Sequence, residues 1–222
     1  PDKGGMARSC ERIVRGLTGA GHRIDLVHFT RRESTWQTEH RAGGTVLRVP
    51  PAADMPHQLN RLWLKVQDGH TPQKYDGVCA FGGALPLQAG PLFAQWLEVP
   101  LVTCFRGNDF DTQVFDVRKT VFVHQALQYS QKIVVNTLEK QRRLQTMAAA
   151  DKISYIPNGI DLEEWTPTGV DRQKALDARA ALDLQDRKLI ALVGQLKAKK
   201  GVPFFLDALR QSGRSDHVHV AF

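Results

Sequence analysis

Short apolar runs alternate along the chain with longer segments whose apolar residues recur at helical spacing. In the first such segment, apolar residues from Met6 to Leu17 recur mostly at intervals of three or four, which is typical of one face of a helix. Gly19 and Gly21 end this segment, and residues 24–29 follow as an apolar strand candidate. The chain therefore begins with a helix that leads into a strand.

The same alternation continues through the rest of the sequence. Seven further apolar runs are strand candidates: Thr45–Val49, Val78–Phe81, Leu101–Phe105, Ile133–Val135, Ile153–Ile156, Leu189–Val193 and His217–Phe222. Helical segments occupy most of the intervals between them. Strands that alternate with helices predict an α/β fold of βαβ units with parallel sheets.

A change in composition after Asp161 predicts a domain boundary. A turn-rich break over 165–169 precedes a polar helical stretch. We expect a first domain over 1–165, a linker over 166–187 and the start of a second domain over 188–222. About 35 residues are too few for a closed core, so the second domain is predicted to be partial.

The first residues indicate a loop that lacks its usual strand. Residues 1–5 form a glycine-containing loop before the first helix, and such a loop normally follows the central strand of a doubly wound sheet. No such strand precedes it, and an apolar run ends the chain at Phe222. The sequence is therefore expected to be a fragment whose first strand is missing.

Composition narrows the class of protein. The chain has 222 residues, is 42% hydrophobic and carries a net charge of +7, which fits a globular protein with an anionic partner. No RNA-binding signature, zinc-finger spacing or basic and aromatic stripe is present, so no nucleic-acid partner is expected. Without a long apolar run or signal peptide, and with three cysteines that lack metal-ligand spacing, we expect a cytoplasmic protein with reduced thiols.

The histidines do not predict a metal site. The eight histidines lack the spacing of metal ligands. His124, in an apolar helical segment, is expected to be a hydrogen-bonded packing residue.

The last third of the chain has the features of a phosphate-binding loop. The apolar run at 189–193 stops at Gly194, crosses a lysine-rich loop to Gly201 and enters an amphipathic segment. Such a loop presents backbone N–H groups and ammonium charge to phosphate. The chain is thus expected to bind a phosphorylated ligand.

Five motifs, in order, resemble one enzyme family. They are Pro1–Gly5, Arg106-Gly107-Asn108-Asp109, Ile133–Thr137, Pro157-Asn158-Gly159-Ile160-Asp161 and Gly194–Gly201. With these motifs the chain resembles the retaining glycosyltransferases of family 4. The resemblance implies the GT-B architecture of two Rossmann-like domains, with a doubly wound parallel sheet followed here by a partial second domain.

The resemblance also implies roles for individual residues. Gly4 and Gly5 would lie beside the donor diphosphate and the acceptor, where small residues let a sugar approach the backbone. Lys200 matches the lysine that meets the donor diphosphate and stabilises the leaving group; the alternative is an exposed loop lysine. Gln195 replaces a frequent arginine, and Lys197 either takes over its phosphate contact or is only a surface charge.

The turn at 106–109 departs from the family pattern. Arg106 stands where many relatives have histidine, so it keeps a hydrogen-bond donor but does not titrate near neutral pH. It would clamp an anionic acceptor or orient the sugar, while Asp109 would accept from a sugar hydroxyl. The alternative is an Arg106–Asp109 pair that holds the turn. Asn158 and Gly159 are expected to form a turn that uses positive φ angles.

The implied reaction moves a sugar from a nucleoside-diphosphate donor to a sugar or lipid-linked acceptor, with retention and without a cofactor or divalent metal. The paired-glutamate motif of the family would follow Phe222, so this chain is expected to be inactive alone. A sugar-nucleotide epimerase and a non-catalytic binding module remain as alternatives. Contact with an anionic membrane at its cytoplasmic face is a further expectation, because the resemblance implies lipid-linked acceptors and the chain is basic. The segment 58–66, with Trp63 and leucines beside Arg and Lys, is the candidate interfacial helix; the alternative is a core-facing helix.

Overall fold

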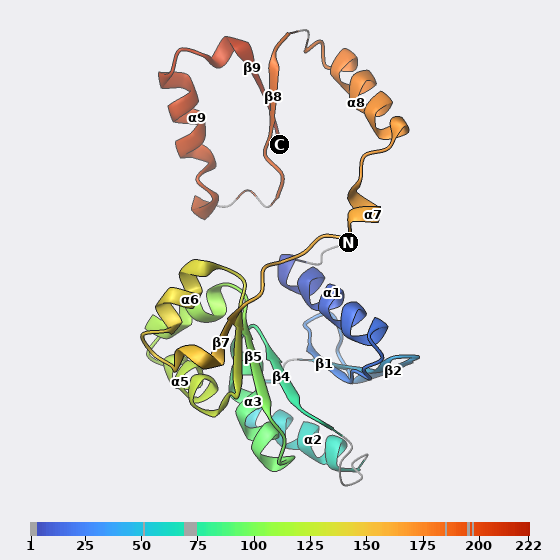
Figure 1. The fold of residues 1–222 in the computed structure, drawn as a ribbon, viewed down its shortest axis with the longest axis vertical. Coiled ribbons are helices and arrows are strands. Elements are labelled where there is room, and N and C mark those ends of the chain that lie inside the picture. Colours follow the sequence, from blue (N-terminus) through green and yellow to red (C-terminus); the bar gives the residue numbers. More distant parts are fainter. Residues whose placement is uncertain (1–3, 51, 69–74, 185, 195, 197) are drawn as a thin grey trace. The chain divides into compact units, whose positions relative to one another are not determined.

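The computed structural model describes residues 4–50, 52–68, 75–184, 186–194, 196 and 198–222. The chain divides into two compact units, Pro1–Gly159 (unit 1) and Ile160–Phe222 (unit 2). Figure 1 shows the elements of both units. Residues 160–165, predicted as the end of the first domain, and residues 166–187, predicted as the linker, belong to unit 2. No helix among the described residues has the length and apolar character needed to cross a bilayer.

Unit 1 contains two sheets and their covering helices. Its helices are α1 (Gly5–Gly19), α2 (Met55–Asp68), α3 (Ala84–Trp96), α4 (Asn108–Asp111), α5 (Thr120–Tyr129) and α6 (Leu138–Leu144). Its strands are β1 (Leu26–Phe29), β2 (Gln37–Arg41), β3 (Gly44–Val49), β4 (Val78–Phe81), β5 (Leu101–Phe105), β6 (Lys132–Val135) and β7 (Ile153–Tyr155). Short 3-10 turns lie at Gln113–Phe115 and Ala150–Lys152.

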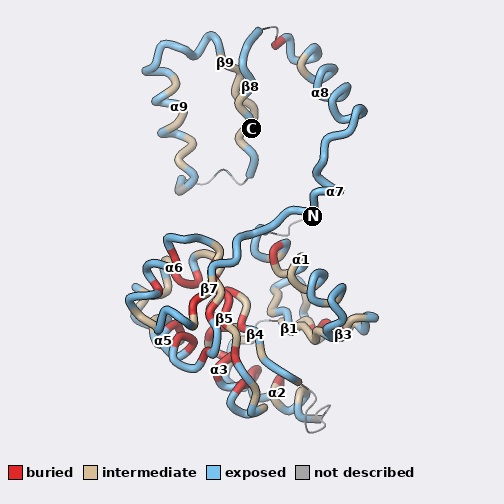
Figure 2. The backbone as a smooth tube through the Cα atoms, in the orientation of Figure 1, coloured by how far each residue is buried: buried red, intermediate tan, exposed pale blue. Residues whose placement is uncertain are grey.

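Sheet B of unit 1 has the strand order β4-β5-β6-β7, and all its neighbours are parallel. In Figure 1, α5 and α6 lie on one side of this sheet. The apolar residues that predicted these strands are buried, with Phe105, Ile133 and Val135 fully inaccessible. Figure 2 shows the concentration of buried residues around sheet B and its helices. The core of unit 1 therefore holds this sheet in place.

Sheet A has the order β1-β3-β2 and includes one strand that the sequence pattern did not predict. β1 and β3 are parallel as expected, but β2 is antiparallel to β3. Its residues are largely exposed and polar, so it lacks the apolar run used to recognise a strand. A tight turn that ends at Gly44 joins it to β3, and there a Cβ would lie 2.1 Å from the Ile24 carbonyl oxygen.

α2 faces the core of unit 1. Leu59 and Leu62 are buried, and the Trp63 ring lies 5.9 Å from Phe93 and 4.7 Å from Trp96. The apolar face of the segment 58–66 thus packs against α3. The prediction of a core-facing helix is confirmed for these residues.

Unit 2 contains α7 (Leu162–Trp165), α8 (Gly169–Ala181), α9 (Val202–Gln211) and the parallel pair β8 (Lys188–Ala191) and β9 (Val218–Ala221). Short 3-10 turns lie at Ala198–Lys200 and Ser215–His217. Thr168 caps α8 through a reciprocal hydrogen-bond pair with Asp171. Among the described residues of this unit, only Leu184 is a buried apolar side chain.

Candidate functional site

Residues from the ends of four strands lie at the carboxyl edge of sheet B. Gly82 follows β4, Arg106 follows β5, Asn136 follows β6 and Asn158 lies beyond β7. In parallel α/β sheets, ligands bind outside the carboxyl ends of the strands. We call Ser9, Gly82, Arg106, Asn136 and Asn158, together with Asp109, the edge cluster.

Arg106 is the centre of this cluster. Its Nη2 donates to Ser9 Oγ at 2.7 Å and also to Asn158 Oδ1. Ser9 Oγ in turn donates to Asn158 Oδ1 at 3.1 Å. The guanidinium carbon lies 5.4 Å from the centre of the Phe81 ring, a cation–π distance. Side chains from β4, α1 and the segment after β7 therefore fix the direction of Arg106.

The Arg106 backbone is held as firmly as its side chain. Its N–H donates to Asp109 Oδ2 at 2.7 Å, and its carbonyl accepts from Asn136 Nδ2 at 3.1 Å. The Gly107 N–H donates to the other Asp109 oxygen. The Asp109 carboxylate thus holds the turn through two backbone N–H groups. The predicted contact within the turn exists, but it joins Asp109 to the backbone and not to the guanidinium.

Asp109 is almost inaccessible, with 1% of its surface exposed. Burial raises the pKa of its carboxyl above the ordinary value, while the N–H bonds from Arg106 and Gly107 act in the opposite direction. A carboxylate in this position already has acceptor sites committed to the protein backbone. Its predicted contact with a sugar hydroxyl stays a prediction.

The start of α1 lies beside the edge cluster. A Cβ on Gly82 would meet Met6 Sδ at 2.9 Å and Asp109 Oδ2 at 3.6 Å, which places the first turn of α1 next to the ends of β4 and β5. A Cβ on Gly4 or Gly5 would meet no atom of the described residues within 4 Å, apart from the chain neighbours and the backbone of α1. Packing of the described residues does not require glycine at either position, so their predicted role beside a ligand remains a prediction.

Three thiols lie close to Arg106. Cys79 and Cys104 have their Sγ atoms 3.8 Å apart, and their hydrogen bond and burial raise the pKa of Cys79. Burial raises the pKa of Cys10 on α1. All three cysteines are free of disulfides.

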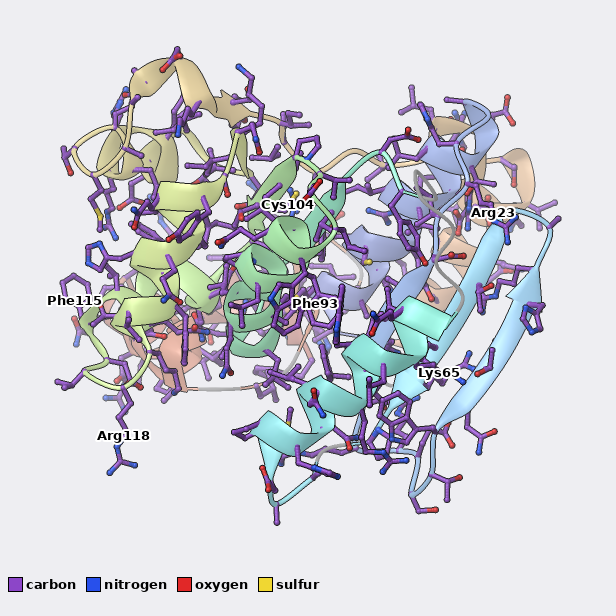
Figure 3. All side chains as sticks on the ribbon, turned by 90° about the horizontal axis from the view of Figure 1, so that it is seen from below. Arg23, Lys65, Phe93, Cys104, Phe115 and Arg118 are labelled. Carbon is purple, nitrogen blue, oxygen red and sulfur yellow. The ribbon has the colours of Figure 1, made fainter. Side chains whose placement is uncertain are left out.

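In Figure 3, Cys104 lies inside unit 1, while Phe115 and Arg118 project at its periphery.

Asn158 does not have the role predicted for it. Neither Asn158 nor Gly159 has a positive φ angle, so the expected turn geometry is wrong. The Asn158 side chain instead accepts from Arg106 and Ser9, and the Gly159 carbonyl accepts from Arg12 Nη1 at 2.8 Å. These bonds tie the segment after β7 to α1.

The lysine-rich loop lies in unit 2. Gly194 has φ +139°, and Gly201 has φ +69° at the cap position of α9. Lys200 is exposed and comes just before this helix, where the first N–H groups and the helix dipole favour an anion. Gln195 and Lys197 lie outside the described residues. Contact of Lys200 with phosphate stays a prediction.

Two other expectations concern histidine and metals. His124 is exposed on α5 and lines a shallow hollow with Gln128 and Lys152, so its assignment as a packing residue is wrong. α5 turns its alanine and leucine side chains inward instead. Within the described ranges, no three His, Cys, Asp or Glu side chains gather closely enough to hold a metal ion.

Sequence reasoning missed Ser9 and Gly82, and it missed the side-chain roles of Asn136 and Asn158. Ser9 lies one helical turn after Gly5, so it shares the face of α1 that begins at the glycine loop. Gly82 and Gly83 stop the β4 run with positive φ angles, a signal visible in the sequence as a glycine pair after an apolar run. The side-chain role of Asn158 left no local signal.

Comparison with known proteins places this site in context. A family model described as "Glycosyl transferase 4-like domain" matches residues 4–159. D-inositol 3-phosphate glycosyltransferase of Jonesia denitrificans is 28% identical over 232 residues, which cover 94% of this chain and 54% of that protein. The protein of the same name from Xylanimonas cellulosilytica is also 28% identical and covers 94% and 55%. The chain thus spans about half the length of the curated relatives that it matches.

Solved structures share the fold. Anabaena HepE, solved in complex with UDP and glucose, has a TM-score of 0.60 and 22% identity, with 80% of this chain and 46% of that chain covered. An E. coli protein described as trehalose-6-phosphate, bound with UDP-2-fluoro glucose, has a TM-score of 0.63 and 12% identity, covering 99% and 61%. These likenesses confirm the predicted α/β fold of the GT-B type.

Proposed function

Since the chain belongs to the glycosyl transferase 4-like domain family, we propose that it is part of an enzyme that transfers a sugar from a nucleoside-diphosphate-sugar donor to an acceptor, with retention of anomeric configuration. The observation that carries this proposal is the family match over residues 4–159, which include the whole edge cluster. The likeness to structures solved with UDP, UDP-glucose or a fluorinated analogue supports a nucleotide-sugar donor.

In this proposal, unit 2 holds the donor diphosphate. Lys200 and the N-terminus of α9 supply positive charge next to each other in the chain, and fixed positive groups stabilise the negative charge that develops on a departing nucleoside diphosphate. Lys197 and Gln195 are further contacts of this loop. Since these groups supply the charge, transfer requires neither a divalent metal nor another cofactor, and a chelator should leave the rate unchanged.

Unit 1 binds the acceptor in this account. Arg106 is fixed at the carboxyl edge of sheet B, and Gly4 and Gly5 leave open space at the start of α1. The acceptor is a sugar or a lipid-linked sugar, and a lipid-linked one would bring the enzyme to the cytoplasmic face of a membrane. The proposal assigns activity to an enzyme that contains a complete donor site, and this chain spans about half the length of its curated relatives.

A transfer assay with an enzyme that contains a complete donor site tests the proposal. Purified enzyme is incubated with a radiolabelled nucleoside-diphosphate sugar, with and without a panel of acceptors. Label that moves to an acceptor supports the transferase. A converted sugar that appears without acceptor indicates an epimerase, and donor binding without turnover indicates a binding module; either result contradicts the proposal.

A further inference from the structure

Arg106 differs from Arg41, Arg48 and Arg143 in the charge of its partners. Arg41 and Arg48 pair with the Glu39 carboxylate, and Arg143 pairs with Glu139. The Arg106 guanidinium donates instead to a hydroxyl and to an amide oxygen, both neutral. Within the described residues it has no carboxylate partner. Its positive charge is therefore directed but not neutralised by the side chains that hold it.

The Asp109 carboxylate in the same turn is bonded to the backbone and not to this guanidinium. Asp109 lies three residues later, yet its two oxygens accept from the backbone N–H groups of Arg106 and Gly107. Arg106 Nε is buried and has no hydrogen-bond partner among the described residues. A ligand cannot reach this inaccessible Nε, but the half-buried guanidinium keeps a positive charge that no side-chain carboxylate among the described residues offsets, and this charge favours an anion. An oxyanion matches the planar donor geometry of a guanidinium.

The contacts that hold Arg106 also lower the conformational-entropy cost of binding an anion. Ser9, Asn158 and the Phe81 ring restrict the guanidinium from three sides. A side chain that is already ordered loses little conformational freedom when a ligand arrives. Neutral partners are suited to this task because they orient the cation and leave its charge available.

We propose that Ser9 and Asn158 are positioning residues that hold Arg106 ready to bind an oxyanion, and that Arg106 thereby selects acceptors which carry a phosphate or carboxylate group. The assignment of this anion to an acceptor substrate rests on the proposed function. The anion site itself needs only unit 1. Asn158 is the decisive residue, since an aspartate there would keep the contact and cancel the charge.

The test uses Asn158→Asp, which is nearly isosteric. The purified protein is titrated with inorganic phosphate and, separately, with acetate, and binding is followed by calorimetry. Thermal unfolding is measured on the same samples. Asn60→Asp on α2, an exposed position, makes the same change in charge and is the matched control. Arg106→Gln removes the cation itself.

We expect Asn158→Asp and Arg106→Gln each to weaken phosphate binding at least tenfold, while Asn60→Asp leaves it unchanged. The unfolding midpoint of Asn158→Asp should equal or exceed that of the wild type, because the new carboxylate pairs with Arg106. A purely structural Asn158 would predict unchanged phosphate affinity in this variant. Tighter binding of phosphate than of acetate identifies a phosphate group, and the reverse a carboxylate.

Two results would overturn the inference: a wild-type protein that binds neither anion, or equal anion affinity in the wild type and in both edge variants. Equal affinity is also the result expected if the anion binds at the loop of Lys200, because neither variant alters that loop. Binding that depends on Arg106 in a protein without transferase activity would refute the proposed function and leave the anion site standing. If the enzyme transfers sugar to neutral acceptors and Asn158→Asp leaves that rate unchanged, the proposed function stands and the selection of anionic acceptors by Arg106 is refuted.

Discussion

The Arg106 guanidinium donates to Ser9 Oγ at 2.7 Å, although 97 positions separate the two residues. This bond joins α1 to the turn after β5. Asn158 accepts from both partners and adds the segment after β7 to the same cluster. The most specific chemistry of unit 1 is thus built by contacts between distant segments.

The first prediction concerns Arg106. In an enzyme that contains a complete donor site, Arg106→Ala should lower turnover roughly 10- to 100-fold, since a hydrogen bond to a charged group contributes about 1.5–3 kcal/mol. Donor affinity should stay unchanged, because the donor diphosphate is assigned to the loop of Lys200. Steady-state kinetics and donor titration separate the two effects. A variant with the normal rate would remove Arg106 from the reaction.

Asp109 should matter for stability. Asp109→Asn replaces one acceptor oxygen with an N–H group that faces a backbone N–H, so we expect a loss of about 1–3 kcal/mol in the free energy of unfolding. Urea denaturation measures this change. Asp76→Asn, at an exposed position of the same unit, is the control and should have little effect. Equal stability of the two variants would mean that the Asp109 bonds to the turn contribute nothing.

Glu39 should give sheet A a dependence on pH. Hydrogen bonds from Arg41 and Arg48 lower the pKa of Glu39 from 4.5 to about 2. A carboxyl with a lowered pKa in the folded state stabilises the protein above its unfolded value, and this contribution is lost as the pH falls toward 2. The difference in unfolding free energy between wild type and Glu39→Gln should therefore shrink from pH 5 to pH 2.

Glu33→Gln is the matched control for that experiment. It removes one carboxyl near the same sheet without breaking the bonds to Arg41 and Arg48. A difference between wild type and Glu39→Gln that stays constant over this pH range would show that the two arginines do not stabilise the Glu39 carboxylate.

Two glycines at the edge cluster should respond differently to alanine. Gly82 has φ +53°, and an added Cβ would lie 2.9 Å from Met6 Sδ, so Gly82→Ala should cost about 1–2 kcal/mol or more. Gly5→Ala meets open space at a helix start and should leave stability equal or slightly higher. Thermal unfolding of both variants checks this contrast. A destabilised Gly5→Ala protein would show that packing, and not a ligand, needs this glycine.

Lys200→Ala should weaken binding of the nucleoside diphosphate. One charge-assisted contact with phosphate contributes about 1.5–3 kcal/mol, so calorimetry on an enzyme that contains a complete donor site should find a corresponding loss of affinity. Lys188→Ala, in the strand that precedes the loop, is a control with the same loss of charge. If Lys200→Ala binds the nucleotide as the wild type does, Lys200 is only an exposed loop lysine.

The sequence predicted the elements of the fold whose residues are buried, because buried strands appear in the sequence as apolar runs. β5 and β6 are predicted because residues such as Phe105 and Ile133 are fully buried, and apolar runs mark such strands. β2 escaped prediction because an exposed edge strand needs few apolar residues. Its pairing with β3 depends on the tight turn that ends at Gly44, which periodicity does not reveal.

The site was only partly predictable for a related reason. Arg106 and Asp109 belong to one short motif, so their sequence marks them. Asn158 lies 52 positions from Arg106 and 149 from Ser9. Local sequence patterns do not predict hydrogen bonds between residues so far apart in the chain. Local reasoning assigned Asn158 to a turn, whereas tertiary contacts gave its side chain another role.

The central claim is tested most directly by proton NMR of the transfer reaction in an enzyme that contains a complete donor site, with the anomeric proton of donor and product followed in time. The account predicts that the sugar leaves the nucleoside diphosphate and appears on the acceptor with the same anomeric configuration. A product of opposite configuration would contradict retention. Conversion of the donor sugar that does not depend on an acceptor would contradict the transferase itself. So would a donor that is not consumed with any acceptor.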